Sequence, residues 1–280
     1  LFYTYLDHYE PRPFNILDEY TNGYGFRTLF SGALGANQTK LQYTFGGEFY
    51  KDEYTWGTFE NLYEENNVNG SLQGDRLTDN NEFRRQFNGF ATVTYPISQK
   101  LTAQLGVNMN KTNYDFKDLF NTGDLNKSAE RNFKTLLLPS LDLTYVLGED
   151  SQIYANLSRG FSNPNLEETL TPDGLINPDI EQETGTNYEL GIRKINGAFS
   201  LEAALYHMRI NNQLVAERIG DDQFIGRNAG KTQHQGLDLD LSYRLSLSEK
   251  ISTIPFVSYG GFTFKYLCQW TEKRHRQSQV

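Results

Sequence analysis

The sequence predicts an all-β fold, an antiparallel β-barrel that crosses a membrane. Three observations support this prediction: apolar and polar residues alternate, the alternating segments are long, and short turns alternate with long loops between them. In 235–245, leucine or tyrosine occupies every odd position from Leu237 onward, and Asp238, Asp240 and Arg244 stand among the even ones. A period of two places successive side chains on opposite faces of a strand.

About eleven strands are expected along the chain, and their connections alternate in length. The expected strands are 1–9, 24–34, 40–50, 83–95, 101–110, 132–146, 152–159, 186–194, 198–213, 235–245 and 250–265. Short turns fall near 35, 97, 148, 196 and 247, and long loops are expected at 10–23, 51–81, 115–131, 161–183 and 217–229. Short turns at one rim and long loops at the other are typical of outer-membrane barrels.

The strand lengths decide between two interpretations of the apolar face. At ~3.3 Å per residue, strands of about 11 to 15 residues span about 36 to 50 Å, longer than the five to six residues usual in globular sheets. In a soluble sandwich the apolar face would be the core; in a barrel it meets lipid and the polar face lines the lumen. Length and loop asymmetry favour the barrel.

Composition agrees with this class and excludes others. The net charge of -9 argues against a nucleic-acid partner, since phosphate binding needs clustered cations. The single cysteine, Cys268, excludes an internal disulfide framework. Aromatic residues make up 14% and Gly occurs 24 times, as expected for β structure. Mean hydropathy is -0.62, which a barrel tolerates because only alternate residues must be apolar.

The sequence gives no support for catalysis, for a cofactor or for a metal site. Asp238 and Asp240 would stand about 7 Å apart on one strand face, a spacing that suits a glycosidase carboxylate pair. Their unbroken alternation with leucines favours a hydrated lumen wall instead, with Arg244 as counter-charge. The histidines show no metal-ligand spacing, and neither a phosphate-binding glycine loop nor a nucleophile elbow is present.

Aromatic and cationic residues point to two surfaces. An aromatic girdle at the membrane interface is expected from Tyr24, Tyr43, Tyr95, Tyr145, Tyr154, Tyr188 and Tyr243. Cations and aromatics at the outer mouth could hold an anionic chelate through charge-assisted hydrogen bonds. The alternative for any one of them is an ordinary solvated loop residue. The candidates in or beside the longest loop are Tyr54, Trp56, Arg76 and Arg84, and those at other loop rims are Arg131 and Arg227.

Three runs carry a family resemblance. SRGFSNPNLEE at 158–168 is followed by INPDIEQETGTNYELGIR at 176–193, and Asn228 begins the pattern N-x-G-K-x-x-x-x-G-L-x-L. Together they resemble the barrel of TonB-dependent outer-membrane receptors, in particular the siderophore and ferric dicitrate branch. Ile180 stands where the family usually has Leu, and Gln182 where Pro is common. The resemblance is strong over about 150–245, whereas the sequence of 1–150 is only compatible with the family.

The resemblance implies a Gram-negative outer-membrane receptor for a ferric siderophore or similar iron chelate. Its full form would be a barrel of 22 strands with an amino-terminal plug, in contact with outer-membrane lipid and energised by TonB–ExbB–ExbD. This chain accounts for about half of those strands and for neither plug nor TonB box. We therefore expect residues 1–266 to form a partial barrel that does not transport alone, and 267–280 to be an atypical tail left by a frameshift or truncation.

Two alternatives remain open from the sequence. One is a receptor of the same architecture that imports another nutrient, such as a glycan or cobalamin. The other is a passive porin or a barrel-anchored adhesin. A plug-encoding sequence upstream would exclude the porin.

Overall fold

The computed structural model describes residues 1–35, 40–66, 70–164, 177, 179–220, 223–228 and 230–267. Sixteen strands and one short 3₁₀ helix (Gly123–Leu125) make up its secondary structure. The strands are β1 (Phe2–Pro11), β2 (Asn15–Leu34), β3 (Leu41–Asn61), β4 (Gln73–Pro96), β5 (Leu101–Asp118), β6 (Ala129–Asn132), β7 (Leu136–Gly148), β8 (Ser151–Ser162), β9 (Glu183–Asn196), β10 (Phe199–Asn211), β11 (Leu214–Gly220), β12 (Gln223–Asn228), β13 (Lys231–Tyr243), β14 (Leu245–Ser248), β15 (Ile251–Thr253) and β16 (Phe256–Tyr266).

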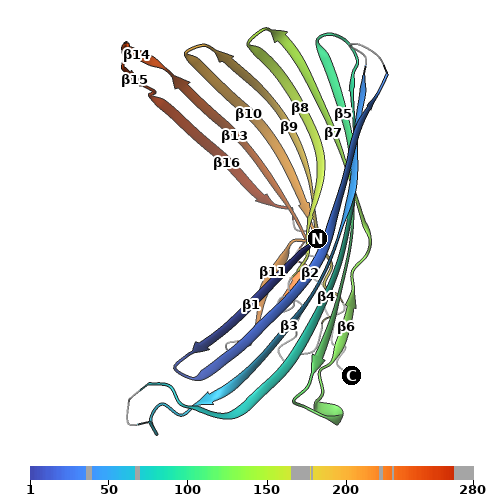
Figure 1. Cartoon of the computed structure of the whole chain (residues 1–280), viewed down its shortest axis with the longest axis vertical. Coiled ribbons are helices and arrows are strands. Elements are labelled where there is room, and N and C mark those ends of the chain that lie inside the picture. Colours follow the sequence, from blue (N-terminus) through green and yellow to red (C-terminus); the bar gives the residue numbers. More distant parts are fainter. Residues whose placement is uncertain are drawn as a thin grey trace, which may run out of the picture.

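One antiparallel sheet organises the chain. Its strand order is β1-β2-β3-β4-β5-β7-β8-β9-β10-β13-β16, and β6 pairs with β5 beside this path. Figure 1 shows the sheet curling into an open trough, with β1 and β16 at its two edges. The predicted all-β antiparallel architecture and the eleven strands of its main path are confirmed. The expected tail lies outside the described residues from Cys268 onward.

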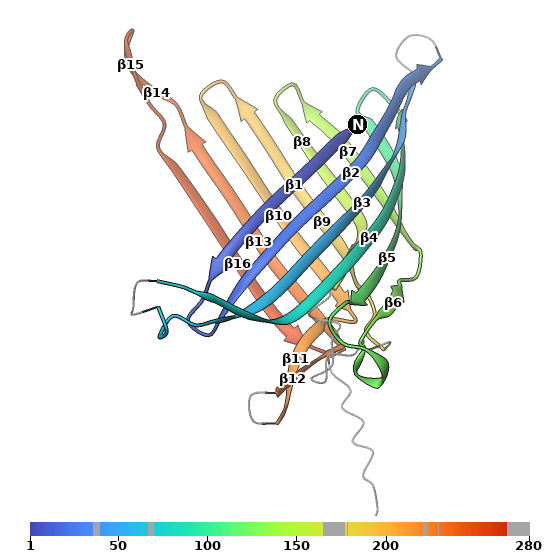
Figure 2. The ribbon, with the colours of Figure 1, turned by 60° about the horizontal axis from the view of Figure 1, so that its bottom comes forward.

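The two ends of the trough differ. Figure 2 shows the hairpin of β11 and β12 at one end and the hairpin of β14 and β15 at the other. We call the end that carries the connections after β3, β5 and β8 the long-loop end, and the opposite end the short-turn end. At the short-turn end, β4 and β5 are joined by 97–100, and β7 and β8 by 149–150.

Several predicted loops are wrong because the strands continue through them. Residues 51–81 were expected to form a loop, but β3 and β4 extend until only 62–72 connects them. Thr58 still pairs with Thr78, whose side-chain oxygen accepts a hydrogen bond of 3.0 Å from the Thr58 backbone N–H. Beyond the lipid neither face must be apolar, so the alternation ends while the backbone ladder does not.

The same effect shortens or structures other connections. Residues 12–14 alone join β1 to β2, where a loop over 10–23 was expected. The expected loop 217–229 contains most of the β11–β12 hairpin, and β5 runs on to Asp118. At the short-turn end, the turn expected near 247 is instead the β14–β15 hairpin between β13 and β16.

The two faces of the sheet have opposite chemistry. Leu190, Leu205 and Leu237 are direct neighbours across β9, β10 and β13, and Leu190 and Leu205 are 58% and 57% exposed. On the other face of the same strands lie Glu189 and Asp238. We call these the apolar face and the polar face. So many exposed leucines in register favour a surface that meets lipid.

The apolar band ends abruptly toward the long-loop end. Phe49 and Phe87 face each other on β3 and β4, and two residues farther on Lys51 faces Arg85. The Lys51 ammonium lies 5.9 Å from the ring centre of Tyr24. Aromatic rings and long cationic side chains are the groups that favour the boundary between lipid and water. We take this row as the outer limit of the membrane-spanning segments.

Most members of the predicted girdle lie on the apolar face, but Tyr154 does not. Its ring packs against Gly191 of the next strand on the polar face, and its hydroxyl donates to Glu189 at 2.9 Å. Tyr206 covers Gly236 in the same way. A Cβ added at Gly236 would lie 2.4 Å from the Tyr206 ring, so glycine is required there for the ring to lie flat on the sheet.

Replacing that glycine should destabilise the sheet. We expect Gly236→Ala to lower the free energy of unfolding by about 1 to 3 kcal/mol, because the tyrosine ring must leave its position. Tyr206→Ala in the same chain should restore part of the loss. Gly160→Ala is the matched control, since its Cβ would meet nothing within 4 Å. Urea titration of the chain in phospholipid vesicles measures all four proteins; equal stability of Gly236→Ala and Gly160→Ala would contradict the packing.

Candidate functional site

A cavity of about 730 Å³ lies on the polar face, beyond the apolar band and toward the long-loop end. Five consecutive strands, β1 to β5, contribute side chains to it. Because side chains from both β1 and β5 line this one cavity, the polar face of the sheet is concave around it. We call it the rim cavity. Its charged residues are the acids Glu10, Glu19, Asp52 and Glu82 and the bases His8, Arg12 and Arg84.

The residues of the rim cavity follow from strand alternation. On β3 the even-numbered residues from Tyr50 to Thr58 face the cavity, and Trp56 is among them. Glu19 lies directly opposite Trp56 on β2, and Glu82 lies directly opposite Tyr54 on β4. Residues directly opposite on neighbouring strands have Cβ atoms about 4.5 to 5.5 Å apart. The register of the ladder therefore sets which charges meet which rings.

Arg84 and Asp52 form an ion pair inside the cavity wall. They are directly opposite on β4 and β3; Arg84 donates from Nη2 to Oδ2 at 2.5 Å and from Nε to Oδ1 at 3.3 Å. Asp52 is only 5% exposed, and the guanidinium carbon lies 5.5 Å from the Tyr50 ring centre. The two charges of this close salt bridge largely cancel, although the Arg84 side chain is 40% exposed.

Glu82 is the acid whose environment most disfavours its charge. Burial raises the pKa of Glu82 to about 7, although the positive charge of Arg84 opposes the rise. Burial also raises the pKa of Tyr114, which lies on the neighbouring strand β5. Near neutral pH, Glu82 is therefore divided between its neutral and charged forms, unlike an exposed glutamate.

Two aromatic rings form a shelf in the cavity. The rings of Tyr54 and Trp56 stack with centres 4.8 Å apart and an interplanar angle of 16°, and Trp56 also contacts Phe116 at 5.7 Å. The Tyr54 hydroxyl donates to Glu19, whose other contact is His8 Nδ1 at 2.9 Å. The shelf is thus held by packing on one side and by hydrogen bonding on the other.

The structure brings together three of the six predicted mouth residues, Tyr54, Trp56 and Arg84. The other three lie elsewhere. Arg76 pairs with Asp79 and stacks over the Phe59 ring at 5.0 Å, and Arg227 pairs with Glu217 at 2.7 Å beside a separate cavity of about 550 Å³.

Arg131 contacts two buried hydrophobic residues rather than the rim cavity. Its guanidinium donates to the backbone carbonyl of Ile180 and lies 5.1 Å from the Phe133 ring centre. Ile180 and Phe133 are both buried. Arg131 thereby fastens the segment before β9 to β6.

Sequence reasoning missed the four acids of the rim cavity and Tyr114. The available signal was the even numbering of Tyr50, Asp52, Tyr54 and Trp56, which continues the alternation past the expected end of the strand. The alternation was hard to recognise because the residues on the other face of β3, such as Lys51 and Glu53, are polar as well.

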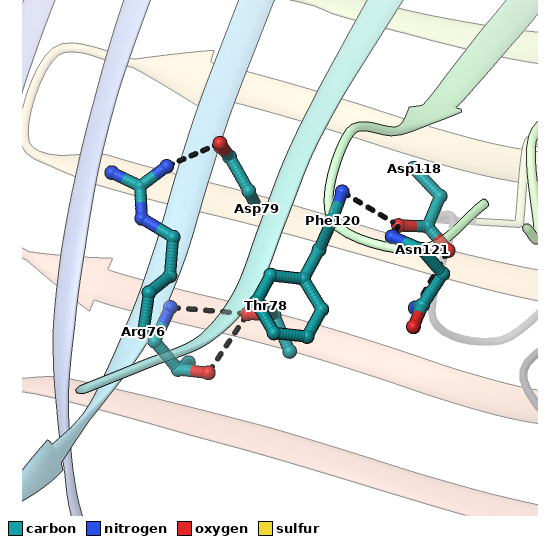
Figure 3. Close-up of polar contacts among 7 residues, drawn as sticks. Arg76, Thr78, Asp79, Asp118, Phe120 and Asn121 are labelled. Atoms are coloured by element: carbon teal, nitrogen blue, oxygen red, sulfur yellow. Dashed lines mark hydrogen bonds and ion pairs between the residues drawn. The ribbon is translucent and has the colours of Figure 1, made fainter.

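The end of β5 beside the cavity is organised by one carboxylate. Figure 3 shows Asp118 with Phe120 and Asn121, next to the Arg76–Asp79 pair of β4. Asp118 accepts backbone N–H bonds from Phe120 at 3.0 Å, Asn121 at 2.9 Å and Lys127 at 3.2 Å. Burial opposes ionisation, but these bonds and the Asn121 amide outweigh it and lower the pKa of Asp118.

The predicted mouth loop 161–183 touches the polar face with its described ends. Tyr114 donates to the Pro164 carbonyl at 3.3 Å, and Asn163 donates to Thr112 at 3.0 Å. Gln182 in turn donates to Asn163 at 2.7 Å. Residues 165–176 and 178 of this loop lie outside the described residues, as do the expected turn residues Asp173 and Gly174.

Two further properties concern the described residues only. Within those ranges, no group of three or more His, Cys, Asp or Glu side chains could hold a metal ion. No helix there is long and apolar enough to cross a membrane.

A family model described as "TonB dependent receptor-like, beta-barrel" matches residues 1–277. This chain belongs to that family. Barrels of TonB-dependent receptors reside in the outer membrane of Gram-negative bacteria, and these receptors are transporters rather than enzymes. The predicted family, fold class and location are thereby confirmed.

Solved structures show the same fold at low sequence identity. The ferric citrate transporter FecA superposes with a TM-score of 0.71 at 17% identity, covering 92% of this chain and 38% of FecA. The alcaligin receptor FauA from Bordetella pertussis gives 0.64 at 16%, covering 94% and 42%. The copper transporter OprC gives 0.67 at 14%, covering 89% and 38%. This TonB-dependent receptor chain therefore spans about two fifths of the length of each of these proteins.

Removing the Asp118 carboxylate should loosen the loop at the end of β5. We expect Asp118→Ala to speed tryptic cleavage after Lys127 about tenfold, because hydrogen bonds to a charged group contribute about 1.5 to 3 kcal/mol each. Asp124→Ala, in the exposed 3₁₀ turn of the same loop, is the control. Unchanged cleavage of Asp118→Ala would contradict this role. Because folding lowers the pKa of Asp118, its carboxylate stabilises the loop fully at pH values above the ordinary pKa of 3.8. This stabilisation is lost as the pH falls through the lowered pKa of the folded chain.

Proposed function

We propose that this chain is part of a receptor that imports a ferric siderophore or a similar iron chelate across the outer membrane. Energy would come from TonB–ExbB–ExbD through a region of the receptor that this chain does not include. The observation that carries the proposal is the rim cavity, a hollow of about 730 Å³ with an aromatic shelf and charged walls on the polar face. Its volume is in the range of small-molecule sites.

The relatives support a metal chelate as the class of cargo. By their printed names, two of the similar structures carry ferric citrate and alcaligin, and a third transports copper. Copper or another nutrient, such as a glycan or cobalamin, is therefore the alternative cargo for a receptor of the same kind. A passive porin or an adhesin is the alternative of a different class.

Among the six residues predicted for the mouth, we propose that Tyr54 and Trp56 contact the ligand directly. Arg84 would act by holding Asp52 and shaping the wall, because its charge is already paired. For Arg76, Arg131 and Arg227 we propose support of the neighbouring loops, in line with their contacts to Asp79, Ile180 and Glu217.

Removal of the Trp56 ring tests the proposed site. In cells that rely on the receptor containing this barrel for iron, we expect Trp56→Ala to weaken binding of the iron chelate about 10- to 100-fold, because buried tryptophans contribute most to such contacts. The measurement is binding of radiolabelled ferric chelate to whole cells. Tyr63→Ala, at an exposed position in the 62–72 connection, is the control and should bind normally.

Energy dependence separates the receptor from the porin. Accumulation of the chelate should stop when TonB is deleted, whereas binding at the surface should persist. Uptake that continues at the same rate without TonB would contradict the proposal and favour a passive pore. If copper or cobalamin is accumulated and ferric chelates are not, the architecture stands and the cargo is another nutrient.

A further inference from the structure

The charges of the rim cavity do not favour an anion. Arg84 is neutralised by Asp52, and Arg12 donates to Glu10 at 2.6 Å. Among the cavity side chains that the structure describes, Glu19 and Glu82 are the acids without a hydrogen bond to a guanidinium, although Arg12 and Arg84 act on them at longer range. His8 is the one further basic group of the wall, and it contacts Glu19. The wall thus holds four acidic side chains against three basic ones.

The two remaining carboxylates are placed on either side of the aromatic shelf. Glu19 on β2 lies directly opposite Trp56, and Glu82 on β4 lies directly opposite Tyr54. The shelf therefore has a carboxylate on each neighbouring strand and two stacked rings between them. The arginine closest in the sequence to Glu82, Arg84, lies over the Tyr50 ring and pairs with Asp52.

Rings and carboxylates in this arrangement suit a positive ligand group. The face of a Trp or Tyr ring attracts an ammonium or guanidinium ion, with about 0.5 to 2 kcal/mol depending on desolvation. A carboxylate beside the ring adds a charge-assisted hydrogen bond. An anionic group on the same shelf would meet both acids, while the two arginines of the wall are already hydrogen-bonded to Glu10 and Asp52.

We infer that the rim cavity binds an organic cation, with the ammonium or guanidinium group packed against the Tyr54–Trp56 stack between Glu19 and Glu82. This inference rests on the proposed function for its biological meaning, since the cation would be an arm of the imported chelate. It names the charge class of that cargo: a chelate with free amino or guanidino groups, rather than a polycarboxylate.

Burial of Glu82 gives the site a dependence on pH. Its pKa of about 7 means that a bound cation must compete with a proton, so binding strengthens as pH rises from about 6 to 8. The other groups around it are Asp52 and Arg84, which remain paired, and Tyr114, whose raised pKa keeps it neutral in this range.

Three probes of similar size and different charge test the inference. Choline, 3,3-dimethylbutan-1-ol and 3,3-dimethylbutyrate are positive, neutral and negative, and each is titrated by saturation-transfer NMR against the receptor that contains this barrel, reconstituted in vesicles. We expect choline to bind at least about tenfold more tightly than the neutral alcohol, and the carboxylate most weakly.

Variants assign that preference to the shelf. Glu19→Gln with Glu82→Gln should bring choline to the affinity of the alcohol and remove the pH dependence, and Trp56→Leu should weaken choline more than the alcohol. Glu65→Gln, at an exposed position in the 62–72 connection, should change neither. Retention of the choline preference in the double variant would overturn the inference, and so would equal binding of the three probes to the parent receptor.

The outcomes also separate this inference from the proposed function. If choline is preferred but the receptor accumulates no ferric chelate, the cation site stands and iron import fails. If ferric chelates are imported and the probes show no preference, iron import stands and the cation site fails.

Discussion

The backbone hydrogen-bond ladder is the constraint on which the rest of this structure depends. In hydrocarbon, each unpaired N–H or C=O group costs several kcal/mol, so strands that face lipid must be paired on both sides. The path from β1 to β16 does this through ten consecutive antiparallel pairings. Among the described residues the two edge strands are paired on one side only, which is why a partial barrel is expected to need completion.

The backbone ladder also determines which polar side chains lie next to one another. Its register places Asp52 opposite Arg84, Glu82 opposite Tyr54 and Glu19 opposite Trp56, although these partners are far apart in the sequence. It continues past the lipid boundary at Lys51 and Arg85, and so carries the polar face outward as a rigid wall. A ligand site on paired strands is held more precisely than one on free loops.

The sequence was sufficient for the architecture where lipid imposes a pattern. The leucines of 235–245 and the apolar residues of 101–110 alternate because one face meets hydrocarbon, and both segments are strands in the structure. The pattern failed at 51–81, where water bathes both faces and pairing needs no apolar side chains. Tyr154 was placed in the girdle because it is a tyrosine near a strand end, but it shares the polar face of β8 with Gln152 and Asn156, where its ring covers Gly191.

The candidate site could be predicted only in part for the same reason. Aromatic and cationic residues in one polar stretch, Tyr54, Trp56 and Arg84, were enough to mark the region. Their roles depend on partners across the sheet: Asp52 removes the charge of Arg84, and Glu19 accepts from Tyr54. The sequence does not show which strands pair in which register, so it could not distinguish Arg84 in the cavity wall from the three arginines that lie outside the cavity.

Along each strand of the barrel, alternate residues face lipid and a water-filled interior. Single fluorescent labels at Leu205 and at Tyr206 of β10, in otherwise identical copies of the receptor that contains this barrel, test this alternation most directly in vesicles, with brominated lipid and aqueous iodide as quenchers. The label at Leu205 should be quenched strongly by brominated lipid and weakly by aqueous iodide, and the label at Tyr206 should show the reverse. Equal quenching of both labels by lipid would contradict this alternation.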